Sequence, residues 1–466
     1  MKRKISKIEK DGRCLMITKM KVSRYYLFSP NAHIVFSVSI KGNPSVEAVK
    51  ASIVNAVQEY EVLNSRILCD VDGEFYYVPR EEFVAPTIEV CESRGTNVEF
   101  LNEQCRKEFD LEKGELIRFV LVPNKDSFEM NVIQHHIAGD GKSMLLLIRR
   151  IMNNLEEIGE SGRIDCLQVR EAKKMEPFTE KYISKYVKLN DLITMSLDKF
   201  NASWEDEKVV YTKQDYQRMH DEYWENNYSY LRSIEINQEQ MHVFRNWCHK
   251  KGVTINNALV TMASRAFKET KKLAIVVDCR AGKFKSYGNY ASSIALDIEY
   301  DESLSFWDNA RKIDNLVKLN LSDYSNALVA LQIYNKVDGT LLDATNFQKI
   351  DKYKCDVVKE YNDTFGLGDE GLPFAISNLG SIEGFPEYGR YEVDKISFYS
   401  PMIPALKSNF SVATINGKMI INIIYRKGID IDFDVIIDSM QQQLSSIINN
   451  LMEICHFDTE LEFQCV

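Results

Sequence analysis

Apolar and polar residues alternate along the chain with two different periods, which predict where strands and helices form. Phe36, Val38 and Ile40 alternate with serines, a period of two that is typical of a strand with one buried face. A helix is expected to follow, because Ser45 suits an N-cap and apolar residues then recur at helical spacing as far as Tyr60. The pattern therefore predicts a strand followed by a helix near the start of the chain.

A hairpin and another helix are expected further along. Residues 116–122 are a predicted strand, 123–127 supply the turn, and 128–134 return as a strand. Apolar residues at helical spacing between 144 and 155 predict a helix. The segment 135–141 is therefore a tight connection between a strand and a helix.

The segment from 157 to about 230 has a different character. It is polar and aromatic, as in the run Trp204-Glu205-Asp206-Glu207 and over 223–228. We interpret it as a crossover between two halves of the chain rather than as part of a core.

A second strand-then-helix unit follows this crossover. A strand is predicted over 230–236, a helix over 238–251 with Asn237 as its cap, and a further helix over about 256–269. Because this order resembles that at the start of the chain, two related lobes are expected. We predict a boundary near residue 205, with an N-terminal lobe over 1–205 that includes part of the crossover and a C-terminal lobe over 206–466.

The rest of the chain adds strands, helices and a hairpin. The predicted elements are strands at 273–277 and 292–300, helices within 304–365, strands near 374, 396 and 410, a strand at 418–425 after the Asn416-Gly417 turn, and a final helix over 435–454. The whole pattern is that of an α/β protein with mixed sheets.

Composition narrows the class of protein. The chain has 466 residues, 45% of them hydrophobic and 27% charged, which is more than one core of ordinary size organises, so two domains are expected. The 58 lysines and arginines are outnumbered by 68 aspartates and glutamates, and the net charge is −10. That balance argues against nucleic acid as a partner.

The cysteines and the chain start bear on the expected location. The ten cysteines form no CxxC pair and no cluster with histidine at metal-ligand spacing, which favours reduced thiols in a cytoplasmic protein. The basic start is not followed by the apolar stretch of a signal peptide, and the longest apolar runs have only the length of a strand. We therefore expect a cytoplasmic protein without a membrane span.

The strongest chemical signal is the run His135-His136-Ile137-Ala138-Gly139-Asp140-Gly141. A metal site is one interpretation, but adjacent residues at the end of a strand point to opposite faces, so the two histidines would not easily share an ion. We expect no metal. A purely structural turn accounts for Asp140 and Gly141 at the start of a helix but not for two histidines.

General-base catalysis is the remaining interpretation of this run. A neutral imidazole, with an ordinary pKa of about 6.5, takes a proton from a hydroxyl or amine and returns it within one turnover. Its ring must be held in one tautomer, which backbone carbonyls in an ordered turn can do. Asp140 would then brace the loop through an arginine.

The run HHxxxDG resembles the signature of an acyltransferase superfamily. This superfamily includes chloramphenicol acetyltransferase, the condensation domains of nonribosomal peptide synthetases, the BAHD acyltransferases of plants and the alcohol acetyltransferases. Further segments are similar to the family in the family's order, namely 109–118, 252–259, 277–280, 287–290 and 376–380. The chain is identified as a stand-alone member.

The resemblance implies a fold and roles for the motif residues. The implied fold is two chloramphenicol-acetyltransferase-like lobes, each a mixed sheet flanked by helices, with an active-site tunnel between them that donor and acceptor enter from opposite faces. His136 is the implied catalytic base, whereas His135, Asp140 and Gly141 are implied to be structural.

An arginine is implied as the salt-bridge partner of Asp140. The condensation-domain pattern has an arginine where this chain has Asn64. We therefore expect Arg280 to be the partner, as in the BAHD branch, with Arg66 as the second choice. The DFGWG motif of the BAHD branch is absent.

Two further sites have both a functional and a structural interpretation. Asn378 either donates a hydrogen bond to the thioester oxyanion or the donor arm, or is a turn residue beside Gly380. The segment 271–285 holds five basic residues and one acidic residue. With Lys283 and Lys285 it either docks the phosphates of coenzyme A or phosphopantetheine, or is a solvated loop.

The resemblance and the residues together predict an acyltransferase. The expected donor is an acyl-CoA, the acceptor a small molecule with a hydroxyl or amine, and the base His136, with no permanently bound cofactor. One alternative is a free-standing condensation enzyme that uses thioesters on an acyl or peptidyl carrier protein. The other is a binding protein that keeps the fold without turnover.

Overall fold

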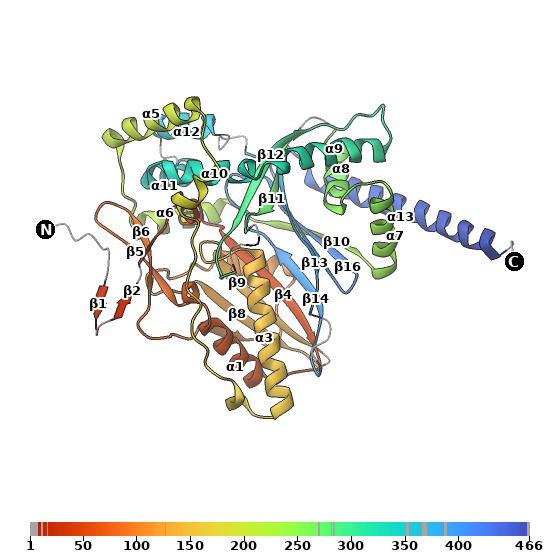
Figure 1. Ribbon diagram of the computed structural model, residues 1–466, viewed down its shortest axis with the longest axis horizontal. Coiled ribbons are helices and arrows are strands. Elements are labelled where there is room, and N and C mark those ends of the chain that lie inside the picture. Colours follow the sequence, from red (N-terminus) through yellow and green to blue (C-terminus); the bar gives the residue numbers. More distant parts are fainter. Residues whose placement is uncertain are drawn as a thin grey trace.

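The computed structural model has two lobes, each built on one large sheet with helices against it (Figure 1). It describes residues 8–463 except 11, 12, 16, 126, 269, 270, 281, 283, 284, 351–353, 366–370 and 386–388, with side chains described from residue 17 to residue 452. The mixed α/β architecture of two lobes that we expected is confirmed.

The N-terminal lobe holds a five-stranded sheet in the order β14, β4, β9, β8, β7. Its strands are β4 (His33–Lys41), β7 (Thr87–Val90), β8 (Ile117–Pro123), β9 (Phe128–His135) and β14 (Glu392–Tyr399). β7 is parallel to β8, and the other neighbours are antiparallel. Helices α1 (Val46–Gln58) and α3 (Gly141–Ser161) pack on one face of this sheet, and α2 (Asn97–Arg106) packs on the other.

β4 and α1 follow from the sequence pattern, with one correction. Ser45 caps α1 by accepting a hydrogen bond from Ala48 N (3.1 Å), as predicted. The prediction that β4 has one buried face is wrong, because Val35 and Ser37 on its second face are also buried. Ser37 tolerates burial because its hydroxyl donates to Asn131 Oδ1 (2.6 Å).

Two small sheets that the sequence did not predict lie beside this lobe. One has the order β3, β6, β5 and the other is a hairpin of β1 and β2. Their bounds are β1 (Ile8–Lys10), β2 (Arg13–Leu15), β3 (Thr18–Lys19), β5 (Ser65–Cys69) and β6 (Phe75–Pro79), with short 3₁₀ helices η1 (Val22–Tyr26), η2 (Glu61–Asn64) and η3 (Ile164–Cys166).

The C-terminal lobe holds a six-stranded sheet in the order β10, β16, β15, β13, β11, β12. Its strands are β10 (Tyr230–Ile236), β11 (Lys271–Asp278), β12 (Ala291–Ile298), β13 (Phe374–Ile382), β15 (Ser408–Ile415) and β16 (Lys418–Tyr425). β13 is parallel to both β11 and β15, so this sheet is mixed.

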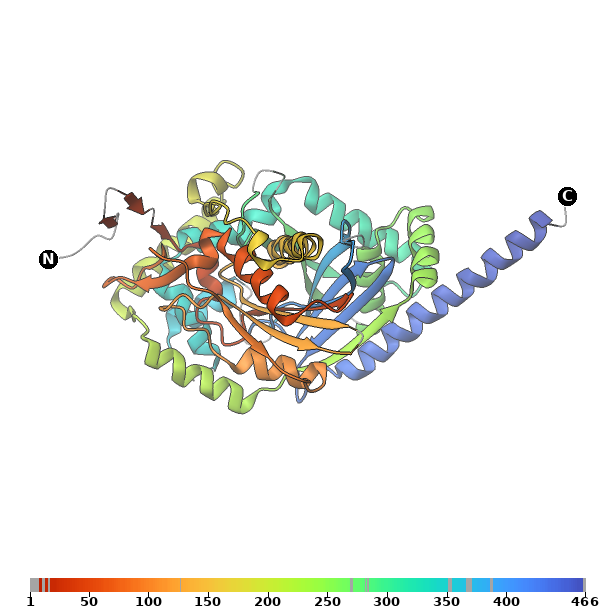
Figure 2. The same cartoon turned by 90° about the horizontal axis from the view of Figure 1, so that it is seen from below.

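One core joins the helices of the C-terminal lobe to its sheet. These helices are α7 (Gln238–Lys250), α8 (Ile255–Phe267), α9 (Phe306–Ser322) and α13 (Phe433–Phe463). Asn237 caps α7 in a capping box, as predicted. The first part of α13 packs against α7 and α8, and the rest of the helix projects away from the lobe (Figure 2).

The interpretation of 157–230 as a segment outside the core is wrong. It contains α4 (Glu180–Ile183), α5 (Asp191–Glu207) and α6 (Lys213–Asn226). Leu197, Phe200 and Trp204 recur at helical spacing on α5 and are buried, and Trp204 Nε1 donates to Thr340 Oγ1 (2.8 Å). Helical caps and a narrow apolar stripe, rather than a continuous apolar run, define these helices.

Helices from the second half of the chain complete the N-terminal core. They are α10 (Tyr324–Lys336), α11 (Gly339–Ile350) and α12 (Asp356–Thr364), within the region predicted to be helical. Residues of α11 and α12 share one core with α5 and α6. Their contacts place part of the second half of the chain on the first lobe.

The predicted boundary near 205 stays a prediction. Glu205 lies inside α5, and β14, far beyond it in sequence, pairs with β4 in the sheet of the N-terminal lobe. In the part of the chain that the structure describes, no helix has the length and apolar character needed to cross a membrane.

Candidate functional site

The two histidines of the motif lie at the end of β9. His135 is the last residue of β9 and pairs with His33 of β4, and His136 N donates to Ala32 O (2.8 Å). The side chain of His136 is buried, and its ring lies against the ring of Tyr26 in η1, with centroids 4.1 Å apart. A buried ion pair between Arg24 and Asp343 (2.6 Å) fastens η1 to α11, which fixes the position of Tyr26.

The contacts of His136 determine which ring nitrogen can act as a base. Nδ1 lies 3.1 Å from Gly139 O, which can only accept, so Nδ1 carries the hydrogen. Asn289 Nδ2 lies 3.2 Å from Nδ1 and donates one of its two hydrogens to the carbonyl oxygen of His136 (3.1 Å). If Nδ1 accepted the other hydrogen, Gly139 O would face a nitrogen lone pair at 3.1 Å, which is unfavourable. Nε2 therefore keeps a free lone pair and is the nitrogen that can accept a proton.

His135 has a different environment. Its Nδ1 accepts a hydrogen bond from Ile137 N (3.3 Å), and its ring packs beside Phe109 and His33. Burial lowers the pKa of His135 to about 3, so the ring is neutral at physiological pH. This position fits the structural role that the resemblance implies.

Asp140 is held at the first turn of α3 by groups from both lobes. It is the N-cap of α3, and its Oδ1 accepts from Ser143 N (2.9 Å). Oδ1 also accepts from Arg280 (2.8 Å), and Oδ2 accepts from Tyr290 N (2.8 Å). The predicted salt bridge between Asp140 and Arg280 is therefore present, and Arg66, the second choice, is exposed.

Ser143 connects the same two segments. Its hydroxyl donates to Gly288 O (2.7 Å) and accepts from Arg280 (2.7 Å). Asp140, Ser143, Arg280, Gly288 and Tyr290 thus form a polar cluster, which we call the Asp140 cluster, between the motif loop and the β11–β12 connection. The cluster holds the loop of the N-terminal lobe against the C-terminal lobe.

The two glycines of the motif lie where a side chain would collide. A Cβ on Gly139 would come within 2.7 Å of the Tyr287 ring, and a Cβ on Gly141 within 2.9 Å of Leu379. The hydroxyl of Tyr287 donates to Gln134, which keeps that ring against the loop. Close packing, rather than an unusual backbone conformation, accounts for both glycines.

A cavity of about 190 Å³ lies beside His136 and is lined from both lobes. The N-terminal lobe contributes η1, β4, β14 and the motif, and the C-terminal lobe contributes β11, β12, β13 and β15. A second, smaller pocket of about 20 Å³ shares Val22 and Asn289 with it and includes Lys19 and Lys21. His136 lines the larger cavity and is not among the residues that line the smaller one, so the tunnel that the resemblance implies stays a prediction.

Asn378 lies in β13 beside this cavity but is not among the residues that line it. Its amide oxygen accepts from Gly380 N (2.8 Å), and its amide nitrogen donates to Asn256 Oδ1 (3.3 Å). Gly380 has a φ of +72° where the register of β13 against β15 shifts between Asn378 and Ser381, a conformation that glycine adopts readily. Asn378 is therefore part of a β-bulge within β13 rather than of a turn, and its contact with the thioester oxyanion or the donor arm stays a prediction.

In the basic segment 271–285, Arg280 forms ion pairs within the protein, whereas Lys285 is exposed to solvent. Arg280 is committed to Asp140 and Asp278, and Lys142 also pairs with Asp278 (2.9 Å). Lys285 is exposed, whereas Lys283 lies outside the described residues. The docking role predicted for Lys283 and Lys285 therefore stays a prediction.

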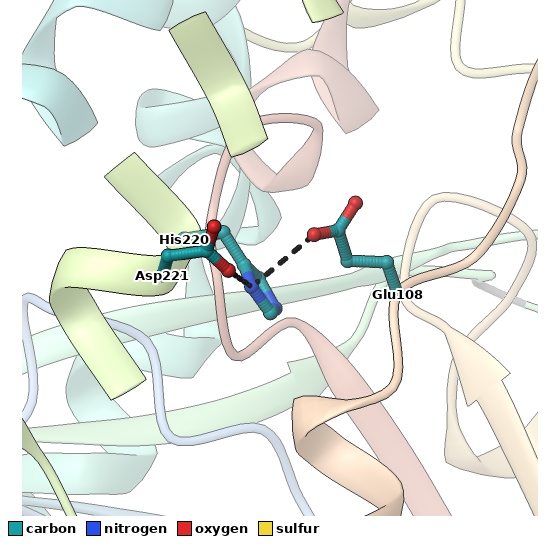
Figure 3. Close-up of side chains that lie close together, drawn as sticks. All are labelled: Glu108, His220 and Asp221. Carbon is teal, nitrogen blue, oxygen red and sulfur yellow. Dashed lines mark ion pairs between the residues drawn. The ribbon is translucent and has the colours of Figure 1, made fainter. Parts of the chain in front are cut away.

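Within the described residues, one group could hold a metal ion. Glu108, His220 and Asp221 place a ring nitrogen and two carboxylates within 4.8 Å of one another (Figure 3). His220 Nδ1 lies 3.3 Å from Glu108 Oε1 and 3.9 Å from Asp221 Oδ1, and burial lowers the pKa of His220 to about 4. None of the three residues lines the cavity beside His136.

Three contacts in the site were not predicted from the sequence. Tyr26 packs on His136, Asn289 donates to its backbone, and Ser143 bridges Arg280 and Gly288. Asn289 belongs to a segment similar to the family, which was the available signal. Tyr26 and Ser143 had none, because their partners are distant in sequence.

Comparison with known proteins identifies the family. The model of the condensation domain matches residues 31–277, just over half of the chain. The chain belongs to the condensation-domain family. Condensation domains are acyl or peptidyl transferases that use thioesters bound to carrier proteins. The family assignment agrees with the resemblance of the HHxxxDG run.

A curated relative is a polyketide synthase-nonribosomal peptide synthetase from Aspergillus clavatus. It is 29% identical over 133 residues, which are 27% of this chain and 3% of that protein. The chain thus spans only a small part of the length of this relative.

Solved structures of the condensation-domain fold align with nearly the whole chain. The epimerization domain from the third module of tyrocidine synthetase B gives a TM-score of 0.61 at 12% identity, over 94% of this chain and 99% of that one. Polyketide synthase associated protein 5 from Mycobacterium tuberculosis gives 0.61 at 12% identity, over 93% and 99%. The first condensation domain of the CDA synthetase gives 0.61 at 13% identity, over 93% and 95%. Because the sequence identities are so low, these structural alignments show a shared fold and no more.

Proposed function

We propose that this condensation-domain protein transfers an acyl group from a pantetheine thioester to a hydroxyl or amine, with His136 as general base. The observation that carries the proposal is the contact of His136 Nδ1 with Gly139 O (3.1 Å), beside a cavity lined from both lobes. It leaves Nε2 free to accept a proton. A protein that only binds has no need of an imidazole held in one tautomer.

The proposed reaction needs one base and no covalent intermediate. Nε2 of His136 takes the proton as the acceptor oxygen or nitrogen attacks the thioester carbonyl carbon. The bond from that carbon to the acceptor forms, the carbon–sulfur bond breaks, and the leaving thiolate receives the proton from Nε2. The products are an ester or amide and a free thiol.

Free acyl-CoA is the proposed donor, and a carrier-protein thioester is the alternative. The test compares kcat/KM for one acyl group on coenzyme A and on the phosphopantetheine of an acyl carrier protein, followed by thiol release. We expect the CoA thioester to be used at least as well as the carrier-bound one. Turnover with the carrier-bound thioester alone would assign the chain to carrier-dependent condensation.

The pH dependence of the proposed reaction follows from the burial of His136. Desolvation lowers the pKa of His136 below its ordinary value of 6.5, although the Gly139 carbonyl and Asp140 oppose this. Because a base must be neutral to take a proton, activity should fall only as the pH drops through this lowered pKa. The acid limb of the kcat/KM profile should therefore have an apparent pKa below 6.5, and a limb centred above that value would contradict the assignment.

The predicted docking role of Lys283 and Lys285 has its own test. Replacing both with glutamate should raise the KM of the donor by up to about tenfold and leave the KM of the acceptor unchanged. Added salt should have the same effect, because exposed charges are screened. Lys312→Glu, an exposed change on α9, is the control. Equal effects on both substrates, or on neither, would return Lys283 and Lys285 to the role of solvated side chains.

A further inference from the structure

The cavity beside His136 is almost free of charge. Among its described lining residues only Asp140 is a carboxylate, and none is a lysine or arginine. Both oxygens of Asp140 already accept hydrogen bonds, from Ser143, Arg280 and Tyr290. A cationic group of a substrate that entered this cavity would meet only this carboxylate, which is already paired with Arg280, and an anionic group would meet no lysine or arginine among the described residues.

Aliphatic and aromatic side chains make up most of the wall. They come from both lobes and include Ile34, Val276, Leu331, Leu372, Phe398 and Leu406. The hydroxyls and amides that join them are neutral. An apolar wall strengthens the binding affinity of a ligand about fourfold for each methylene group that it removes from water.

We propose that the acyl group transferred at His136 is an uncharged aliphatic chain without an α-ammonium group. This inference rests on the proposed function, and it concerns which thioester the site accepts. The one carboxylate in the described wall, Asp140, is already engaged by Arg280, Ser143 and Tyr290, and an unpaired α-ammonium group is costly in an apolar site. An aminoacyl thioester must therefore lose a proton before it binds.

The acyl chain is proposed to lie in this cavity of about 190 Å³, beside the side chain of His136. Ala330 on α10 lines the cavity next to Leu331. Because its side chain is small, a larger residue at 330 would occupy space that the acyl chain needs.

Two thioesters that share one carbon skeleton test the inference. Isocaproyl-pantetheine and leucyl-pantetheine differ only in the α-amino group, and their dissociation constants are measured by calorimetry with the full chain and no acceptor. At pH 6 the α-amino group, with a pKa of about 7.7–8.0, is charged. We expect leucyl-pantetheine to bind about 50-fold more weakly at pH 6, and within about threefold of isocaproyl-pantetheine at pH 9.

Two variants, each of which replaces an alanine with phenylalanine, test where the acyl chain binds. Ala330→Phe should weaken the binding of isocaproyl-pantetheine at least tenfold, whereas Ala202→Phe, at an exposed position of α5, should not change it. Unchanged affinity in Ala330→Phe would overturn the placement of the acyl chain in this cavity.

The outcomes separate this inference from the proposed function. Equal binding of the two thioesters at pH 6, or no binding of isocaproyl-pantetheine, overturns the inference, even where acyl transfer is observed. The expected preference in a protein that transfers acyl groups to no acceptor supports the inference and overturns the proposed function.

Discussion

Replacing His136 with alanine is expected to lower kcat for acyl transfer by about two to four orders of magnitude while the fold stays intact. The variant removes the Nε2 lone pair that the contact between Nδ1 and Gly139 O leaves free. Donor binding should change little, because the cavity is lined mainly by other side chains. Steady-state thiol release gives kcat, and circular dichroism with thermal melting reports the fold.

His135→Ala is the matched control for this variant. It removes the acceptor of Ile137 N, and an unsatisfied buried N–H costs about 1–3 kcal/mol of unfolding free energy. We therefore expect a loss of stability, with kcat of the folded fraction reduced far less than in His136→Ala. Near-normal kcat in His136→Ala, or an equal loss of kcat in both variants, would remove His136 from the role of base.

Replacing Asp140 with alanine is expected to destabilise the protein by about 3 kcal/mol. The change removes the buried partner of Arg280, the cap of α3 and the acceptor of Tyr290 N. Breaking one side of a buried ion pair costs about 3–5 kcal/mol, and we expect the lower end because Asp278 still faces Arg280 (2.9 Å). Urea denaturation measures the change in unfolding free energy.

Activity should fall in the Asp140 variants because the motif loop moves, not because a reacting group is lost. Asp140→Asn keeps an N-cap residue but removes the charge, so it separates the cap from the ion pair. A double-mutant cycle with Arg280→Gln should give a coupling energy of at least about 1 kcal/mol between the two positions. Additive effects, or a loss of activity in Asp140→Ala without loss of stability, would contradict a bracing role.

Local sequence patterns were sufficient to predict several helix caps and the elements on either side of the motif. Ser45 and Asn237 were expected as caps and are caps, since a cap depends only on residues three positions away. The motif loop was expected between a strand and a helix, and β9 ends at His135 while α3 begins at Gly141. These features are set by short-range contacts.

The features that the sequence did not predict depend on contacts between distant segments. β14 joins β4 across some 350 residues, with Tyr399 opposite Val35, and nothing in the alternation of a strand specifies its neighbour. The burial of Val35 and Ser37 follows from packing on the second face of the sheet. The polar composition around Trp204 predicts a crossover, whereas its burial depends on distant segments, such as Thr340 of α11, which accepts a hydrogen bond from its Nε1.

In the candidate site, too, contacts between distant segments were predicted only where the family resemblance indicated them. The pairing of Asp140 with Arg280 was expected because the resemblance supplied a long-range partner, and the structure contains it. The placement of Tyr26 on His136 had no such signal. For Asn378, the resemblance suggests a contact with the donor, which stays a prediction, while its hydrogen bonds to Gly380 and Asn256 lie at a bulge of β13 that no local pattern indicates.

A count of products tests the central claim most directly. The protein is mixed with an acyl pantetheine thioester and a panel of alcohols and amines, and free thiol, acylated acceptor and the mass of the protein are measured together. Direct transfer with His136 as base predicts equal amounts of thiol and acylated acceptor, no thiol without acceptor, and an unchanged protein mass. One equivalent of thiol released without acceptor, together with an acyl group attached to the protein, would contradict it, as would a folded protein that acylates no acceptor from either class of donor.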